Sequence, residues 1–225
     1  MASKKRTKEM DVLFIIDSTG SMKNAIEAAH NKVEDIAFEI RQVNRKADFK
    51  FGCVCYRDKA CDPKDENEVY DFDPEIESLS IFLGKIKAKG GGGDGPEDWV
   101  SALNDAFKLS WRKGKKAIIW LADMPAHGKR FAGRDKFPEE EAKLIPLIER
   151  LASEQIYFVG ISLKKAALKT FSEMKAIYEA KGGKSFRIEQ FSSESGAEIA
   201  GIERTMLESS RSVVNSAFAD MDNDD

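Results

Sequence analysis

Residues 11–21 read Asp-Val-Leu-Phe-Ile-Ile-Asp-Ser-Thr-Gly-Ser. The apolar run 12–16 is typical of a buried strand, and it leads directly into Asp17, Thr19 and Ser21. A tight turn there would bring one carboxylate and two hydroxyls together, and such oxygen groups are ligands for hard cations. Ligands of open α/β sheets also bind at the carboxyl ends of strands. Because Thr and Ser equally cap helices, this stretch alone favours neither a cap nor a ligand set.

The composition indicates a soluble globular protein. The chain has 225 residues, of which 42% are apolar and 33% charged, with a net charge of −3. That charge gives no general attraction to nucleic acid, and no apolar run approaches the roughly 20 residues of a membrane span, so we expect neither a nucleic-acid partner nor membrane insertion. We expect a basic arm over residues 1–10, one domain over 11–219 and an acidic tail over 220–225. The arm lacks the apolar segment of a secretory signal.

The cysteines indicate a reducing compartment. Three cysteines make an odd count with no disulfide framework, so we expect a cytoplasmic protein. Cys53 and Cys55 are two residues apart on a predicted strand, and we expect them to pack as small hydrophobes. A zinc site could be drawn from these two with Cys61 and His127, but the paired spacings of structural zinc sites are absent.

Strands alternate with helices along the whole chain, which predicts an α/β fold with a doubly wound, Rossmann-like sheet. We expect a mostly parallel six-stranded sheet covered by helices on both faces, with one short antiparallel edge strand at 69–72. The predicted strands are 12–17, 49–56, 69–72, 116–122, 156–161 and 185–188. The predicted helices are 22–43, 76–88, 97–111, 138–152, 164–180 and 195–219.

Acidic residues follow several of these elements. Asp17 and Asp123 each end a strand, Asp58 follows another, and Glu97 follows the Gly-rich segment 90–96. If the first and fourth strands are neighbours, their carboxylates converge. Two carboxylates about 4 Å apart repel by about 4 kcal/mol at an effective dielectric constant near 20. Such a cluster must raise its pKa values or hold a cation, and neighbouring hydroxyls favour the cation because they add no negative charge.

Three segments together resemble a von Willebrand factor type A domain with a metal-ion-dependent adhesion site. They are Asp17-Ser-Thr-Gly-Ser21, Asp94-Gly-Pro-Glu97 and the strand-ending Asp123, and the resemblance covers about residues 11–190. It implies a divalent-cation-dependent protein-binding module rather than an enzyme. Mg²⁺ is the implied ion, with Mn²⁺ as a substitute, and an acidic residue of a protein partner would complete its coordination. The implied ligands are Asp17, Thr19, Ser21, Glu97 and Asp123. Thr19 stands where the family usually has Ser.

The resemblance also implies a second site and a wider context. By its match to a neighbouring cation site in β-integrins, Asp58 and Asp94 would hold a second divalent cation, although Asp58 could equally pair with Arg57 or Lys59. His127 lies in the loop beside the proposed site, where we expect either a structural role or a contact that supports a metal ligand. The motifs around residues 56–58, 90–98 and 122–128 are most similar to the domain that accompanies α-kinases. A regulatory or targeting domain of such a kinase is therefore an alternative function.

Enzymatic alternatives lack essential residues. A phosphatase of the haloacid dehalogenase type needs an acid where Thr19 stands. A phosphate-binding loop at 182–185 would need a glycine at position 178, where Tyr178 stands, and a helix after the loop, which is not predicted. A Ser21–His127 hydrolase pair lacks the nucleophile elbow. A metal-dependent hydrolase stays as an alternative, but no general base for it is evident.

Overall fold

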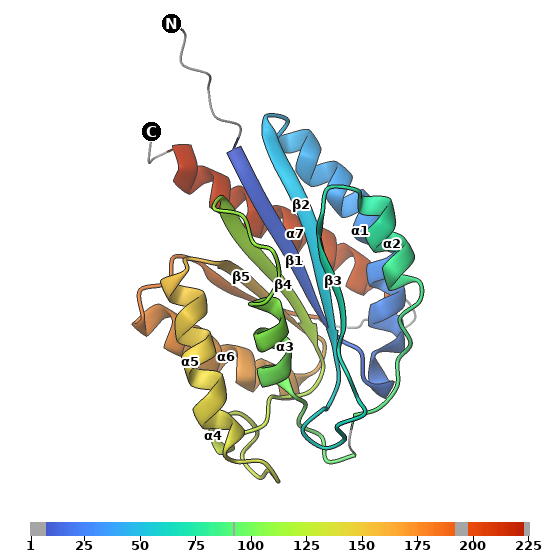
Figure 1. Cartoon of the computed structure of the whole chain (residues 1–225), viewed down its shortest axis with the longest axis vertical. Coiled ribbons are helices and arrows are strands. Elements are labelled where there is room, and N and C mark those ends of the chain that lie inside the picture. The colour runs from blue at the N-terminus through green and yellow to red at the C-terminus, as the bar shows by residue number, and fades with distance from the viewer. Residues whose placement is uncertain (1–7, 92, 192–197, 223–225) are drawn as a thin grey trace, which may run out of the picture.

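A six-stranded sheet with the order β3-β2-β1-β4-β5-β6 forms the centre of the computed structural model (Figure 1). The model describes residues 8–91, 93–191 and 198–222. All neighbouring strands are parallel except β2 and β3, which are antiparallel. The predicted fold is therefore confirmed, including the antiparallel edge strand. The strands are β1 Lys8–Asp17, β2 Ala47–Tyr56, β3 Glu68–Asp73, β4 Lys115–Ala122, β5 Tyr157–Ser162 and β6 Phe186–Gln190.

Side chains of β1 alternate between two hydrophobic cores, as the pleat of a strand requires. Val12, Phe14 and Ile16 pack into the core under α1, α2 and α7. Leu13 and Ile15 pack into the core under α3, α5 and α6 on the opposite face. The sheet is therefore buried on both sides, which explains the uninterrupted apolar run. The helical elements are η1 Gly20–Met22, α1 Lys23–Val43, α2 Ile76–Leu83, α3 Trp99–Ala106, α4 Lys129–Ala132, α5 Glu140–Ser153, α6 Lys165–Ala180 and α7 Glu198–Asp222.

Several element boundaries differ from the prediction. The helix predicted to reach residue 88 ends at Leu83, and Ile86 packs onto the core from the following loop. The helix predicted from residue 97 begins at Trp99, because the Asp98 side chain caps it by accepting the Ser101 N–H. The predicted loop 124–137 contains the short helix α4. Strand β1 begins at residue 8 and α7 continues to residue 222. Residues 195–197 of the predicted last helix lie outside the described residues.

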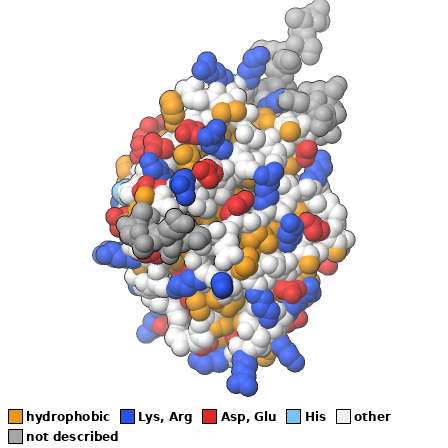
Figure 2. Space-filling view, turned by 180° about the vertical axis from the view of Figure 1, so that it is seen from behind, with side chains coloured by type: hydrophobic (Ala, Val, Ile, Leu, Met, Phe, Trp, Pro, Cys, Tyr) orange, Lys and Arg blue, Asp and Glu red, His pale blue; other side chains and the backbone are white. Residues whose placement is uncertain are grey.

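The outer face on the side of α1 and α7 carries a mixed surface. Figure 2 shows basic and acidic side chains interspersed over this face, with apolar patches between them. This mixture agrees with the small net charge of −3. Of the helices in the described residues, none is both long and apolar enough to cross a membrane.

Parallel pairing places three acidic residues at one edge of the sheet. Strand β1 lies between β2 and β4, with Asp17 opposite Tyr56 and Ile16 opposite Leu121. Asp58 follows the end of β2 by two residues and Asp123 directly follows β4. The carboxyl ends of all three strands therefore meet where open α/β sheets bind their ligands.

Candidate metal centre

The turn after β1 is arranged around the buried Asp17 carboxylate. The backbone N–H and the hydroxyl of Thr19 both donate to Oδ1 of Asp17, at 2.9 and 2.7 Å. Thr19 also occupies the N-cap position of η1, but its side chain makes no capping hydrogen bond. The hydroxyl thus fixes the carboxylate instead of the helix end, which argues against the cap interpretation for Thr19. Ser21 is exposed within η1, at the rim of this turn.

Glu97 approaches the same turn from the Gly-rich segment. Its backbone N–H donates to the carbonyl of Pro125 at 2.9 Å, which ties the segment to the loop after β4. Gly91, at φ +102°, lies over the buried groups, and a Cβ there would be 3.1 Å from both Oε1 of Glu97 and Cβ of Thr19. The low-complexity glycines therefore allow the backbone to pack directly against the acidic groups.

Asp123 completes a group that we call the Asp17 cluster, which consists of Asp17, Thr19, Glu97 and Asp123. Its carboxylate is buried, and Oδ2 accepts from Nζ of Lys164 at 2.6 Å. The Lys164 side chain is 56% exposed, so this cation reaches the cluster from the solvent side. Lys164 was not predicted as a site residue.

The Asp17 cluster lacks positive charge in its interior. Burial raises the pKa of Asp17 to about 7, with a contribution from the charge of Asp123 and opposition from the Thr19 hydrogen bonds and Lys164. Burial also raises the pKa of Glu97 to about 10, and the carboxylates of Asp17, Asp58 and Asp123 add to the effect. These shifts are expected when buried like charges share a site without a cation.

The unpartnered oxygens of the structure lie on the predicted acidic residues. Among the described residues, every buried side-chain oxygen without a hydrogen-bond partner belongs to one of five carboxylates. They are Oδ2 of Asp17, Oδ2 of Asp58, Oδ1 of Asp94, Oε2 of Glu97 and Oδ1 of Asp123. Leaving a buried polar atom unsatisfied is costly. The donor set therefore fits divalent cations, which these oxygens would bind.

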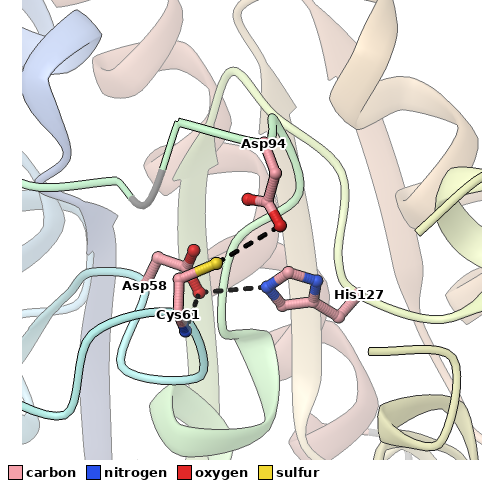
Figure 3. A group of neighbouring side chains, drawn as sticks. All are labelled: Asp58, Cys61, Asp94 and His127. Carbon is pink, nitrogen blue, oxygen red and sulfur yellow. Dashed lines mark hydrogen bonds and ion pairs between the residues drawn. The ribbon is translucent and has the colours of Figure 1, made fainter. Parts of the chain in front are cut away.

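A second group lies beside the first, and we call it the His127 cluster (Figure 3). It consists of Asp58, Cys61, Asp94 and His127, each with a candidate ligand atom within 4.8 Å of the others. Nε2 of His127 lies 3.0 Å from Oδ1 of Asp58, and Sγ of Cys61 donates to Oδ2 of Asp94 at 3.2 Å. Residues from three separate loops thus converge on one point.

Asp135 fixes the imidazole of His127 from the other side. Its Oδ1 lies 2.8 Å from Nδ1 of His127, while Oδ2 accepts the Gly128 N–H. Burial works to lower the pKa of His127, but the hydrogen bonds with Asp58 and Asp135 outweigh it and raise the pKa to about 9. At Asp58, burial works to raise the pKa, but hydrogen bonds from His127 and Cys61 outweigh it and lower the pKa.

Two of the alternatives for these residues are wrong. Asp58 does not pair with Arg57 or Lys59 as a solvated charge, because it is buried against His127, whereas Arg57 donates to Glu68 at 2.7 Å. The zinc set drawn with Cys53 and Cys55 is also wrong, because both lie in a hydrophobic core.

Cys61 and His127 nevertheless lie closer to the acidic residues than their sequence context predicts. The signal for Cys61 was its position three residues after Asp58, which places both side chains in one turn. Asp135 was missed altogether, and its eight-residue separation from His127 within a loop follows no recognisable pattern.

Comparisons with known proteins agree with this architecture. The family model of the von Willebrand factor A domain matches residues 11–188. The alpha-protein kinase vwkA of Dictyostelium discoideum is 29% identical over 163 residues, which cover 69% of this chain and 26% of that protein. The chain thus spans about a quarter of the length of this relative.

Two solved structures share the fold at low sequence identity. The pilus adhesin SpaC from Lactobacillus rhamnosus GG has a TM-score of 0.62 at 10% identity, covering 93% of this chain and 30% of SpaC. Proximal thread matrix protein 1 from the mussel byssus has a TM-score of 0.56 at 13% identity, covering 92% of this chain and 46% of the mussel protein. At such identities the likeness concerns the fold alone.

Proposed function

The chain belongs to the von Willebrand factor A domain family, and from this we propose that it is a divalent-cation-dependent protein-binding module. The observation that carries the proposal is the set of buried, unpartnered carboxylate oxygens at the carboxyl edge of the sheet. Three of the five belong to Asp17, Glu97 and Asp123 of the Asp17 cluster. A cation would satisfy these atoms and would offset the burial and the mutual repulsion that raise the pKa values of Asp17 and Glu97.

Mg²⁺ is the ion that suits the Asp17 cluster, and Mn²⁺ is its natural substitute. Carboxylates and hydroxyls are hard oxygen ligands, and Mg²⁺ keeps several waters when protein groups bind it. Asp17, Glu97 and Asp123 would hold the ion directly or through water, with the hydroxyls of Thr19 and Ser21 as neutral ligands. The bound ion supplies a position that accepts a carboxylate from Asp or Glu of a partner protein. Ser21 lies at the exposed rim, which is the side from which a partner can approach.

Calorimetric titration tests the metal part of this proposal. We expect Mg²⁺ and Mn²⁺ to bind the wild-type chain at this site with one-to-one stoichiometry. Neither ion should bind to Asp17→Ala. Glu77→Ala, which removes an exposed acid from α2, is the matched control and should bind as the wild type does. Absence of binding to the wild type at millimolar Mg²⁺ would refute the proposal.

Affinity capture tests whether a protein partner binds to the chain through the metal ion. The wild-type chain and Asp17→Ala are used as baits in Mg²⁺ and in chelator, with extract from the organism that encodes the chain. A partner that binds through the ion is retained only by the wild type in Mg²⁺. Retention that is indifferent to both chelator and the substitution would show that binding does not use the metal.

The similarity to vwkA supports a second candidate, a regulatory or targeting domain within an α-kinase-type protein. The matched segment covers only 26% of that kinase, so the remainder of such a protein has ample room for a catalytic domain. Sequencing the complete transcript decides the matter. Continuation into a kinase domain supports this candidate, and a stop codon after residue 225 without an upstream kinase domain rejects it.

We propose a binding role in preference to hydrolysis. The nearest histidine, His127, is held between Asp58 and Asp135 and belongs to the neighbouring cluster. Incubation with phosphoester and peptide substrates in Mn²⁺ tests this choice. Turnover that disappears in Asp17→Ala would establish a hydrolase instead.

A further inference from the structure

The geometry points to a zinc site formed by Asp58, Cys61, Asp94 and His127, which lies beside the Asp17 cluster and shares no ligand with the proposed Mg²⁺ site. The four candidate ligand atoms lie within 4.8 Å of one another. Figure 3 shows their side chains directed toward one another from the loop after β2, the Gly-rich segment and the loop after β4.

The ligand types select the metal. A cysteine sulfur and an imidazole nitrogen are poor ligands for Mg²⁺ and Ca²⁺, which prefer oxygen atoms alone. Zn²⁺ binds sulfur, nitrogen and carboxylate oxygen in one tetrahedral shell. The His127 cluster offers one sulfur, one nitrogen and two carboxylates, so its chemistry matches zinc and differs from that of the Asp17 cluster.

The spacing of the atoms agrees with this assignment. Zinc bonds of about 2.0–2.3 Å place tetrahedral ligand atoms about 3.3–3.8 Å apart. Nε2 of His127 is 3.0 Å from Oδ1 of Asp58, and Sγ of Cys61 is 3.2 Å from Oδ2 of Asp94. The other pairs of ligand atoms lie within 4.8 Å of each other, so their separations need to change by no more than about 1 Å for the four groups to surround one ion.

His127 already has the orientation of a metal ligand. Its Nδ1 faces Oδ1 of Asp135 at 2.8 Å, while Nε2 faces the cluster. A ligating histidine commonly gives its other N–H to a carboxylate, which fixes the tautomer and the ring. The ring of Phe137 packs edge-on against the imidazole, with 4.9 Å between centroids. Asp135 is thus a positioning residue for Nε2.

Two unpartnered oxygens distinguish a metal site from a simple network of hydrogen bonds. His127 and the Cys61 N–H both engage Oδ1 of Asp58, and Cys61 and Lys136 both engage Oδ2 of Asp94. Oδ2 of Asp58 and Oδ1 of Asp94 remain buried without a partner. The Asp58 side chain is fully buried and that of Asp94 is 7% exposed. A cation would satisfy both atoms, whereas the existing network does not.

The site would also brace the neighbouring cluster. Asp94 precedes Glu97 by three residues, and His127 donates its backbone N–H to the Glu97 carbonyl at 3.3 Å. An ion held by Asp94 and His127 would connect the two segments that position Glu97. Zinc should therefore raise the thermal unfolding midpoint of the chain.

Competition with a chromophoric zinc chelator tests the site on the full chain after removal of metals. We expect one equivalent of Zn²⁺ to bind and Cys61→Ala to weaken the affinity by at least about 100-fold. Cys53→Ala is the matched control, since Cys53 lies in a hydrophobic core, and should keep wild-type affinity. Circular dichroism checks that each variant is folded. Asp94→Asn provides a second variant without a change of shape and should weaken zinc binding similarly.

Cobalt gives an independent readout of the ligands. Co²⁺ bound to the wild type should show a thiolate-to-cobalt charge-transfer band and intense tetrahedral visible bands, and both should be lost in Cys61→Ala. Asp17→Ala should retain zinc binding while losing Mg²⁺, so failure of one site is distinguishable from failure of the other. Absence of stoichiometric zinc binding, or equal zinc affinity in Cys61→Ala and the wild type, would overturn the proposal.

Discussion

Nζ of Lys164 lies 2.6 Å from Oδ2 of Asp123, and this ion pair joins an exposed lysine to a buried carboxylate of the Asp17 cluster. The lysine backbone is held in place, because its carbonyl accepts a hydrogen bond from Ser162 at 2.7 Å. Its charge also opposes the rise of the Asp17 pKa. Lys164 would therefore compete with the proposed metal ion for the same carboxylate.

Replacing this lysine should strengthen metal binding. We expect Lys164→Met to raise the Mg²⁺ affinity about twofold to fivefold, because an ion pair whose lysine lies largely in solvent is worth up to about 1 kcal/mol. The same substitution should lower the stability of the metal-free chain, since it removes a positive charge from an acidic cluster. Calorimetry measures the affinity. Lys165→Met, at the exposed neighbouring position, is the control and should change neither quantity. Weaker Mg²⁺ binding by Lys164→Met would contradict the competition.

Neutralising Asp17 should stabilise the metal-free chain but weaken its binding of metal. In Asp17→Asn the amide oxygen can still accept from Thr19, while the buried negative charge disappears. We expect a higher thermal midpoint in chelator than that of the wild type. Mg²⁺ affinity should fall by about 100-fold or more, because even groups that only support metal ligands change affinity by 10–100-fold. Thermal melts with chelator and with Mg²⁺ measure both effects. A variant that is less stable in chelator would show that the ionised carboxylate stabilises the fold.

The stability of the metal-free chain should fall as the pH rises. The pKa of Asp17 is about 7 in the folded chain against an ordinary value of 3.8, and that of Glu97 is about 10 against 4.5. Between each pair of values the folded state binds more protons than the unfolded state, so the free energy of unfolding decreases with pH. The decrease in the free energy of unfolding that is due to Asp17 ends near pH 7 and amounts to at most about 4 kcal/mol. The decrease that is due to Glu97 continues at higher pH.

Denaturant titrations from pH 5 to pH 8 in chelator measure the slope of the free energy of unfolding against pH. Asp17→Asn and Glu97→Gln should each flatten it, and saturating Mg²⁺ should flatten it in the wild type because the ion replaces the bound protons. His127 contributes in the same direction above pH 6.5, since its pKa is raised to about 9, but it does so in all three chains. Equal slopes in the wild type and Asp17→Asn would exclude the shifted pKa of Asp17.

The fold could be predicted because the sheet is buried on both faces. The apolar run of β1 and the helical stripe of α1 are strong periodic signals, and their bounds differ from the prediction by only a few residues. Helix ends were harder to predict. Ile86 continues the apolar spacing of α2 although it packs on the core from a loop, and Asp98 starts α3 later by capping it. Local capping and tertiary packing decide such ends.

The candidate site could be predicted where residues follow strands or belong to the family motif. Asp17 and Asp123 end neighbouring parallel strands, so topology alone brings them together. Lys164 reaches Asp123 from 41 residues away, and Asp135 reaches His127 from within an irregular loop. Such contacts depend on loop conformations that no periodic pattern encodes.

The Gly-rich segment offers a final test, because two of its glycines both have a positive φ but differ in their surroundings. Gly91 and Gly93 have φ values of +102° and +75°. A Cβ at Gly91 would lie 3.1 Å from Oε1 of Glu97 and from Cβ of Thr19, whereas a Cβ at Gly93 would meet nothing within 4 Å. Both alanine variants therefore suffer the backbone penalty of about 1 kcal/mol, but only Gly91→Ala also presses on the Asp17 cluster.

We expect Gly91→Ala to weaken Mg²⁺ binding about tenfold or more, because a small misplacement of a ligand is costly at a site that demands regular geometry. Gly93→Ala should lower stability slightly and leave the affinity unchanged. Calorimetry with Mg²⁺ and thermal melts in chelator separate the two effects. Equal loss of affinity in both variants would mean that the segment acts through its backbone conformation, and unchanged affinity in Gly91→Ala would show that Glu97 and Thr19 can shift without harm to the bound ion.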